Sequence, residues 1–202
     1  YGKYMPAKHL VMSIGLPFSG KSTLADEYAA RGYQIISRDD LLAEIIASDE
    51  FKKEESLIKE RHTEPTQAKE LFAARNELAI QFLNHKLAET IKTGNAENIF
   101  YGGTNLQKKT RQGVFALKHE SVTVDGIYLK TPLEEIIRRA RADYESKKRT
   151  DSFNQEAFNE GTFLKMVQLF EEPTAEEGFD NLEIREWRPP QEQNTELKKG
   201  FK

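Results

Sequence analysis

The sequence predicts an α/β protein built on one parallel sheet of five strands, with helices on both faces. Three observations lead to this prediction. Short apolar runs alternate with longer segments of helical periodicity along most of the 202 residues. A glycine-rich loop follows the first apolar run and leads into a helix. Strands that are joined by helices in this way form parallel sheets, which helices cover on both sides.

Five apolar segments are expected to be the strands, and each is short enough to cross a sheet once. They are residues 10–14, 33–37, 98–103, 121–129 and 182–187. The first helix is expected between the glycine-rich loop and Gly32, because Leu24 and Tyr28 recur at helical spacing and glycine commonly ends a helix. Residues 40–94 are expected to be mostly helical, with Gly94 as a second stop.

Composition limits the class of protein. The length fits one domain spanning residues 1–202, with a core at about 9–187 and flexible tails at 1–8 and 188–202. No apolar run approaches the ~20 residues that a membrane span needs. The chain has no cysteine, which excludes disulfides and thiolate zinc sites, and we expect a cytoplasmic protein. A net charge of −3 does not favour broad binding to nucleic acid.

Residues 15–23, GLPFSGKST, form a phosphate-binding motif in strand-loop-helix context. Gly15 and Gly20 permit backbone angles that turn successive N–H groups toward one anion. Lys21 would reach the outer phosphates of ATP, and the Ser22 hydroxyl would bind Mg²⁺. The nucleotide-binding residues predicted from this loop are Gly15, Pro17, Ser19, Gly20, Lys21, Ser22 and Thr23.

Residues 37–42, SRDDLL, follow the second strand, which ends beside the phosphate loop in such a sheet. Phosphoryl transfer to a hydroxyl needs a carboxylate that accepts the proton, and Asp39 is the candidate. Arg38 is a candidate contact to a substrate phosphate. We expect Asp40 to cap a helix that begins near Leu41.

The basic segment 136–150 follows the fourth strand and carries few apolar residues after Ile137. It could form a helical lid that excludes water and brings arginine to the phosphates, or only a solvated helix face. The composition does not separate these two interpretations. Three basic clusters are expected to be solvated helix faces unless the fold points them at the nucleotide: residues 108–111, 138–141 and 147–149.

Three segments resemble the 5′-hydroxyl polynucleotide kinase family. They are GLPFSGKSTLADEYAARGYQIISRDDL (15–41), GGTNLQKKTR (102–111) and FEEPTAEEGFDNLEI (170–184), and the similarity covers most of residues 9–187. The resemblance implies a P-loop kinase fold and ATP- and Mg²⁺-dependent phosphorylation of the 5′-OH end of DNA or RNA. The third segment is the most specific of the three, because it has no general mechanical reason to recur.

The resemblance also implies roles for single residues. Lys21 and Ser22 match the phosphate and metal residues, and Asp39 matches the general base. Thr104 and Asn105 match the motif on the acceptor side. Arg141 matches the catalytic arginine of the lid, and the further candidates for a lid contact to the nucleotide are Arg138 and Arg149.

The sequence departs from this family at two positions. Gly103 stands where the family usually has Asp before Thr-Asn, and Leu42 stands where some members place an arginine that grips substrate phosphate. These departures favour an alternative, a related P-loop kinase that acts on a nucleoside or another small hydroxyl compound. A nucleotide-binding regulatory module is a third hypothesis, which the base and the basic segment disfavour. The sequence leaves the oligomeric state open.

Overall fold

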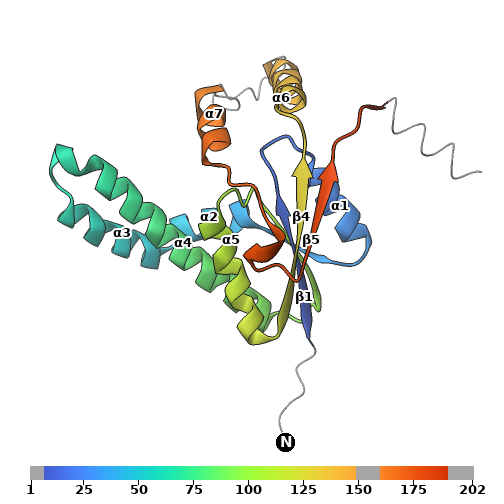
Figure 1. The fold of residues 1–202 in the computed structure, drawn as a ribbon. Coiled ribbons are helices and arrows are strands. Elements are labelled where there is room, and N and C mark those ends of the chain that lie inside the picture. The colour runs from blue at the N-terminus through green and yellow to red at the C-terminus, as the bar shows by residue number, and fades with distance from the viewer. Residues whose placement is uncertain (1–6, 149–159, 191–202) are drawn as a thin grey trace, which may run out of the picture.

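Five strands form a single parallel sheet, as the sequence predicts (Figure 1). The computed structural model describes residues 7–148 and 160–190. The strand order is β2-β3-β1-β4-β5, so the first strand lies at the centre of the sheet. Because all strands run the same way, their carboxyl ends meet at one edge. The strands are β1 (Lys8–Ile14), β2 (Gln34–Ser37), β3 (Asn98–Gly102), β4 (Val122–Lys130) and β5 (Asn181–Glu186).

Helices follow every strand but the last in the described part of the chain. The α-helices are α1 (Lys21–Ala30), α2 (Arg38–Ala47), α3 (Asp49–Arg61), α4 (Ala68–Thr93), α5 (Lys108–Phe115), α6 (Leu133–Lys148) and α7 (Glu160–Leu169). Three short 3₁₀ helices are η1 (Pro65–Gln67), η2 (Ala116–Glu120) and η3 (Ala175–Glu177). None of the helices in residues 7–148 and 160–190 is long and apolar enough to cross a lipid bilayer.

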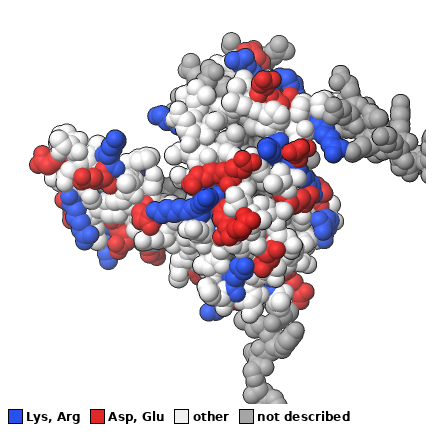
Figure 2. All heavy atoms as spheres, in the orientation of Figure 1, with Lys and Arg blue, Asp and Glu red and all other residues white. Residues whose placement is uncertain are grey.

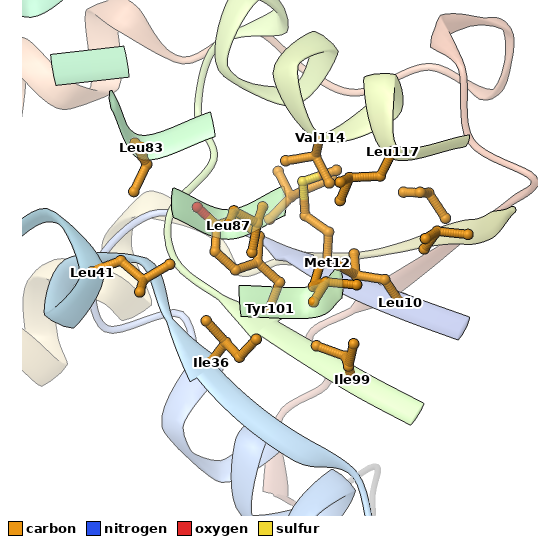
Figure 3. Packing of buried hydrophobic residues seen from close by; sticks show 14 of the residues in the cluster. Leu10, Met12, Ile36, Leu41, Leu83, Leu87, Ile99, Tyr101, Val114 and Leu117 are labelled. Atoms are coloured by element: carbon orange, nitrogen blue, oxygen red, sulfur yellow. The ribbon is translucent and has the colours of Figure 1, made fainter. Parts of the chain in front are cut away.

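The sheet separates two apolar clusters, because successive side chains of a strand point to opposite faces. Leu10 and Met12 of β1 lie in the larger cluster with Leu87 of α4 and Val114 of α5 (Figure 3). Val11 lies between them in the chain and belongs to the smaller cluster on the other face, under α1. Helices therefore cover both faces, as the alternation of elements predicts.

Helices α3 and α4 extend away from the sheet as an antiparallel pair (Figure 1). At its base, the rings of Phe51 and Phe82 meet edge to face with centroids 5.6 Å apart. Farther along α4, Phe72 is 66% exposed.

Two expected boundaries differ in the structure. Helix α2 begins at Arg38, and the Asp40 N–H donates to Ser37 Oγ at 3.3 Å, so Ser37 and not Asp40 is the cap. Both residue types cap helices well, and Asp40 lies instead in the first turn, where the helix dipole favours a negative charge. Strand β1 begins at Lys8, within the segment expected to be a flexible tail. The remainder of that segment and most of the C-terminal one lie outside the described residues.

Candidate active site

The phosphate loop connects β1 to α1 at the carboxyl edge of the sheet. Gly20 adopts a left-handed conformation with φ 104°, which glycine tolerates without a steric cost. A side chain at Gly15 would place Cβ 2.6 Å from Ser19 Oγ and would displace that hydroxyl. Among the described residues no side chain caps α1, so the N–H groups of its first turn remain available to an anion. The buried Ser19 Oγ also lacks a partner there.

Lys21 folds across this loop. Its ammonium donates to the carbonyl oxygens of Gly15 at 3.0 Å and Leu16 at 2.6 Å. Burial lowers the pKa of Lys21 from 10.5 to about 8, and the negative charge of Asp39 acts in the opposite direction. The base predicted on α2 and the lysine predicted in the loop are therefore electrostatic neighbours.

The end of β3 is tied to the end of β1. The Ser13 hydroxyl donates to Gly103 O at 2.9 Å and accepts from Gly103 N–H at 3.0 Å. The Gly15 N–H donates to Thr104 O at 3.1 Å, and Asn105 Nδ2 donates to Ser13 O at 2.9 Å. These four bonds place Thr104 and Asn105 directly beside the phosphate loop.

Gly103 makes room for Arg38. A Cβ at Gly103 would lie 2.9 Å from Arg38 Cβ and 3.1 Å from Arg38 Cδ. An aspartate at this position, as in the resembled family, could not coexist with Arg38 in its present place. The buried Nε of Arg38 has no hydrogen-bond partner among the described residues, so the guanidinium retains donor capacity.

A cavity of about 160 Å³ opens between these groups. Its lining includes Arg38, Thr104 and Asn105, with Leu169 of α7 on another side. Buried polar atoms without a partner are rare in native proteins, and each needs an explanation such as a catalytic role or a bound water or ion. Here both Arg38 Nε, a donor, and Asn105 Oδ1, an acceptor, lack one within the described chain. Both residues line the cavity, so a ligand that reached these two atoms could bind to one donor and one acceptor.

A second hollow of about 260 Å³ lies on the other side of the phosphate loop. Ser19 and Thr131 line it together with Arg185 and Trp187 at the end of β5. The Thr131 hydroxyl donates to Ser19 O at 3.1 Å and so fixes the loop against this wall. The phosphate loop thus separates two hollows, and a larger one of about 390 Å³ between α2 and α4 lies apart from both.

Helix α6 contacts the phosphate loop through Arg139. Its Nη1 donates to Phe18 O at 3.0 Å, and its Nε donates to Glu135 at 3.0 Å. Arg138, a predicted contact to the nucleotide, is exposed and pairs with Glu135 at 2.6 Å. The Glu135 pKa lies at about 2, chiefly through its hydrogen bond with Arg138.

Arg141, the predicted lid arginine, is exposed and lies two positions beyond the residue that meets the loop. Two positions along an α-helix are roughly 200° of rotation, so Arg139 and Arg141 occupy different sides of α6. No site role was predicted for Arg139 from the sequence. The apolar residues Ile136 and Ala140 stand at i, i+4 spacing and so indicate the inner side of the helix, with Arg139 next to it. Both apolar residues are buried in the structure. Arg149 lies outside the described residues.

The residues beside the loop fit a magnesium nucleotide. No group of three His, Cys, Asp or Glu side chains that could hold a metal occurs within the described ranges. Mg²⁺ does not need such a cage, since it commonly takes one or two protein oxygens and the remainder from phosphates and water. The exposed Ser22 hydroxyl in the first turn of α1 could supply one of these oxygens.

Comparison with known proteins supports a P-loop kinase fold for this chain. The shikimate kinase of Clostridium botulinum (strain Okra) is 28% identical over 163 residues, which are 80% of this chain and 82% of that enzyme. A sugar kinase from Janibacter sp. HTCC2649 superposes with a TM-score of 0.54 at 17% identity and covers 97% of this chain and 94% of its own.

The APS kinase of Mycobacterium tuberculosis, solved with AMPPNP and APS, superposes with a TM-score of 0.52 at 16% identity. That comparison covers 96% of this chain and 98% of the APS kinase. At these identities the solved structures establish a shared fold. The model of a family described as "AAA domain" matches residues 10–173. The chain therefore belongs to this AAA domain family and has the fold of P-loop kinases.

Proposed function

We propose that this protein is an ATP-dependent kinase that phosphorylates a hydroxyl group of a small, negatively charged acceptor. One observation supports this most directly: Arg38, Thr104 and Asn105 line a cavity, Thr104 O accepts from the phosphate-loop Gly15 N–H, and Asp39, the residue after Arg38, acts electrostatically on Lys21. A cationic donor suits an anionic group on the acceptor. A carboxylate near Lys21 suits the acceptance of a proton from the hydroxyl that is phosphorylated.

The residues divide the reaction between them. ATP, when bound with Mg²⁺, supplies the phosphoryl group and the leaving ADP. Lys21 and the first-turn N–H groups of α1 would hold the phosphates, and Ser22 would hold the metal. Asp39 takes the proton of the acceptor hydroxyl while that oxygen forms its bond to phosphorus and the bond to ADP breaks. Arg139 reaches the loop from α6 and stabilises the negative charge of the transferred group.

The size of the cavity indicates which part of an acceptor it can hold. About 160 Å³ is smaller than the ~300–1,000 Å³ typical of sites for drug-sized ligands. A single ring with its hydroxyl and acidic groups is the class of compound that fits. The small-molecule kinases among the similar proteins are consistent with this class.

A 5′-OH end of DNA or RNA is the second candidate acceptor, because the sugar ring of its terminal nucleotide could enter the same cavity. One observation favours it. The C-terminal segment that resembles the polynucleotide kinases touches residues 103–107, which connect β3 to α5 and are called the acceptor loop below. In this contact the Glu171 N–H donates to Leu106 O at 2.8 Å. Against it, Lys and Arg alternate with Asp and Glu over the face shown in Figure 2, without a broad basic track.

The test is transfer of label from γ-labelled ATP to a panel of acceptors with Mg²⁺ present. The panel contains shikimate, hexoses and their phosphates, nucleosides, and 5′-OH oligomers of DNA and RNA. The Asp39→Asn variant should lose about 10²–10⁴-fold in rate while it still binds ATP. Asp40→Asn is the matched control, because both carboxylates are exposed in the first turn of α2.

Label on a small acidic hydroxyl compound would support the proposal, whereas label confined to oligomers would replace it by the second candidate. If Asp39→Asn keeps the activity, or Asp40→Asn loses as much, the assignment of the base is wrong.

A further inference from the structure

A buried ion pair joins the C-terminal segment to helix α5. Arg111 is completely buried and Glu177 is 3% exposed at the side chain. Arg111 Nε donates to Glu177 Oε1 at 2.5 Å, and Nη2 donates to Oε2 at 3.2 Å. Burying such a pair costs much of the attraction that it gains, so it is weak evidence for a purely stabilising role. The function of the Arg111–Glu177 pair must therefore be inferred from the other contacts that these two side chains make.

The third donor of Arg111 reaches the acceptor loop. Nη1 donates to the backbone oxygen of Asn105 at 2.9 Å. Asn105 has a φ of 44°, in the left-handed region that asparagine adopts more readily than most residues. A charge-assisted hydrogen bond to its carbonyl stabilises this conformation of the loop.

The orientation of the Asn105 side chain is fixed in turn. Its amide nitrogen donates to Ser13 O at 2.9 Å, and because a carbonyl can only accept, the nitrogen must be the atom on that side. The other atom, Oδ1, is buried without a hydrogen-bond partner in the described chain. Asn105 lines the cavity with Arg38 and Thr104. An acceptor that donates a hydroxyl proton would satisfy this oxygen.

Glu177 is itself held rigidly. Its Oε2 accepts from Thr174 N–H at 3.1 Å in a capping box that begins η3. The next residues pack on α5, where the rings of Phe179 and Phe115 meet edge to face at 4.8 Å. Glu177 is therefore a fixed anchor for Arg111, and through it for the acceptor loop.

We propose that the Arg111–Glu177 pair positions Asn105 so that its side-chain oxygen binds a hydroxyl of the acceptor. The inference rests on the proposed kinase function and deepens it. Arg111 and Glu177 do not touch the reacting atoms in this proposal. Their effect on the reaction passes through Asn105, so they are positioning residues.

The test measures the KM for the acceptor that the label identifies, the KM for ATP and the melting temperature in matched variants. Arg111→Lys keeps a positive charge for Glu177 but loses the planar fork that also reaches Asn105. We expect the acceptor KM to rise about tenfold, as for the loss of one hydrogen bond to the ligand, with the ATP KM within about twofold. Glu177→Gln should likewise raise the KM for the acceptor and leave the KM for ATP almost unchanged.

Lys118→Met is the control, because Lys118 also joins this part of the chain to the C-terminal segment. It pairs with Asp180 at 3.3 Å and donates to Gly178 O at 3.0 Å, with no bond to Asn105. This variant should lose stability without a change in the acceptor KM. If Arg111→Lys and Glu177→Gln lower only the melting temperature, the pair is structural and the inference is overturned.

A second measurement does not need the acceptor. The side-chain amide signals of Asn105 in a ¹⁵N–¹H spectrum should shift in Arg111→Lys and stay in place in Lys118→Met. If the wild-type protein phosphorylates nothing in the panel while these signals shift, the proposed function fails and the positioning stands. If the Asn105 amide signals do not change in Arg111→Lys, the proposal that Arg111 positions Asn105 is wrong, whichever acceptors are phosphorylated.

Discussion

Replacing Gly103 by alanine should weaken binding of the acceptor, because the new methyl group displaces Arg38. The added Cβ would lie 2.9 Å from Arg38 Cβ and 3.1 Å from Arg38 Cδ. Carbon atoms pack best at about 3.5–4.0 Å, so the overlap is several tenths of an ångström at two atoms. Overpacking of this kind costs about 1–3 kcal/mol if nothing moves. The half-buried Arg38 side chain can relieve it by turning away from Gly103.

The magnitude follows from what Arg38 contributes. A hydrogen bond to a charged group is worth about 1.5–3 kcal/mol, which corresponds to a rise of about 10–150-fold in the acceptor KM. The assay is initial rate against acceptor concentration at saturating ATP. The KM for ATP should remain near the wild-type value, because the contacts within the phosphate loop do not involve Arg38.

Gly102→Ala is the matched control, because it adds the same methyl group at the neighbouring position. Its Cβ would meet Phe100 Cε1 at 3.5 Å, an ordinary van der Waals contact. This variant should therefore bind the acceptor almost as the wild type does. An unchanged acceptor KM in Gly103→Ala, or an equal loss in both variants, would refute the reasoning about Arg38.

Three further predictions address the loop, helix α6 and α2. Since burial sets the pKa of Lys21 at about 8, ATP affinity should fall as the pH rises through that value, because the lysine then loses its positive charge. Calorimetry in two buffers should show proton uptake on binding near pH 8, and Lys21→Arg should lack it. In steady-state kinetics Arg139→Ala should lower kcat at least tenfold and Arg141→Ala much less, in contrast to the role expected for Arg141 from the sequence. Ser37→Ala should lower the free energy of unfolding by about 0.5–2 kcal/mol in urea titration, and Asp40→Ala should lower it less, because only Ser37 caps the helix.

Local patterns predicted the sheet well. Each of the five strands lies within two or three residues of its expected range, because short apolar runs between turn signals are a local property of the chain. The parallel topology then brings the phosphate loop, Arg38, Asp39 and Thr104 to one edge. The place of each of these residues in the fold follows from the strand that precedes it in the chain.

Such local patterns do not predict contacts between residues that lie far apart in the sequence. Arg111 stands in a basic cluster and was expected on a solvated helix face, yet it is completely buried. Its partner Glu177 lies 66 residues later, and spacing along the chain does not reveal such a pair. The acceptor is a similar case. The motifs indicate a phosphoryl transfer but not the compound that receives the phosphate. Recognition of that compound depends on Arg38, and the room for Arg38 comes from Gly103, which follows a different strand.

The late position of Glu177 has a consequence for biosynthesis. A ribosome that adds roughly 5–20 residues per second produces Glu177 about 3–13 s after Arg111. During that interval Arg111 lacks the Glu177 carboxylate, and an unpaired buried charge would cost about 3–5 kcal/mol. Helix α5 is therefore expected to dock on the sheet only after η3 has been made. A growing chain could form its phosphate loop, and even bind ATP, before it can hold an acceptor.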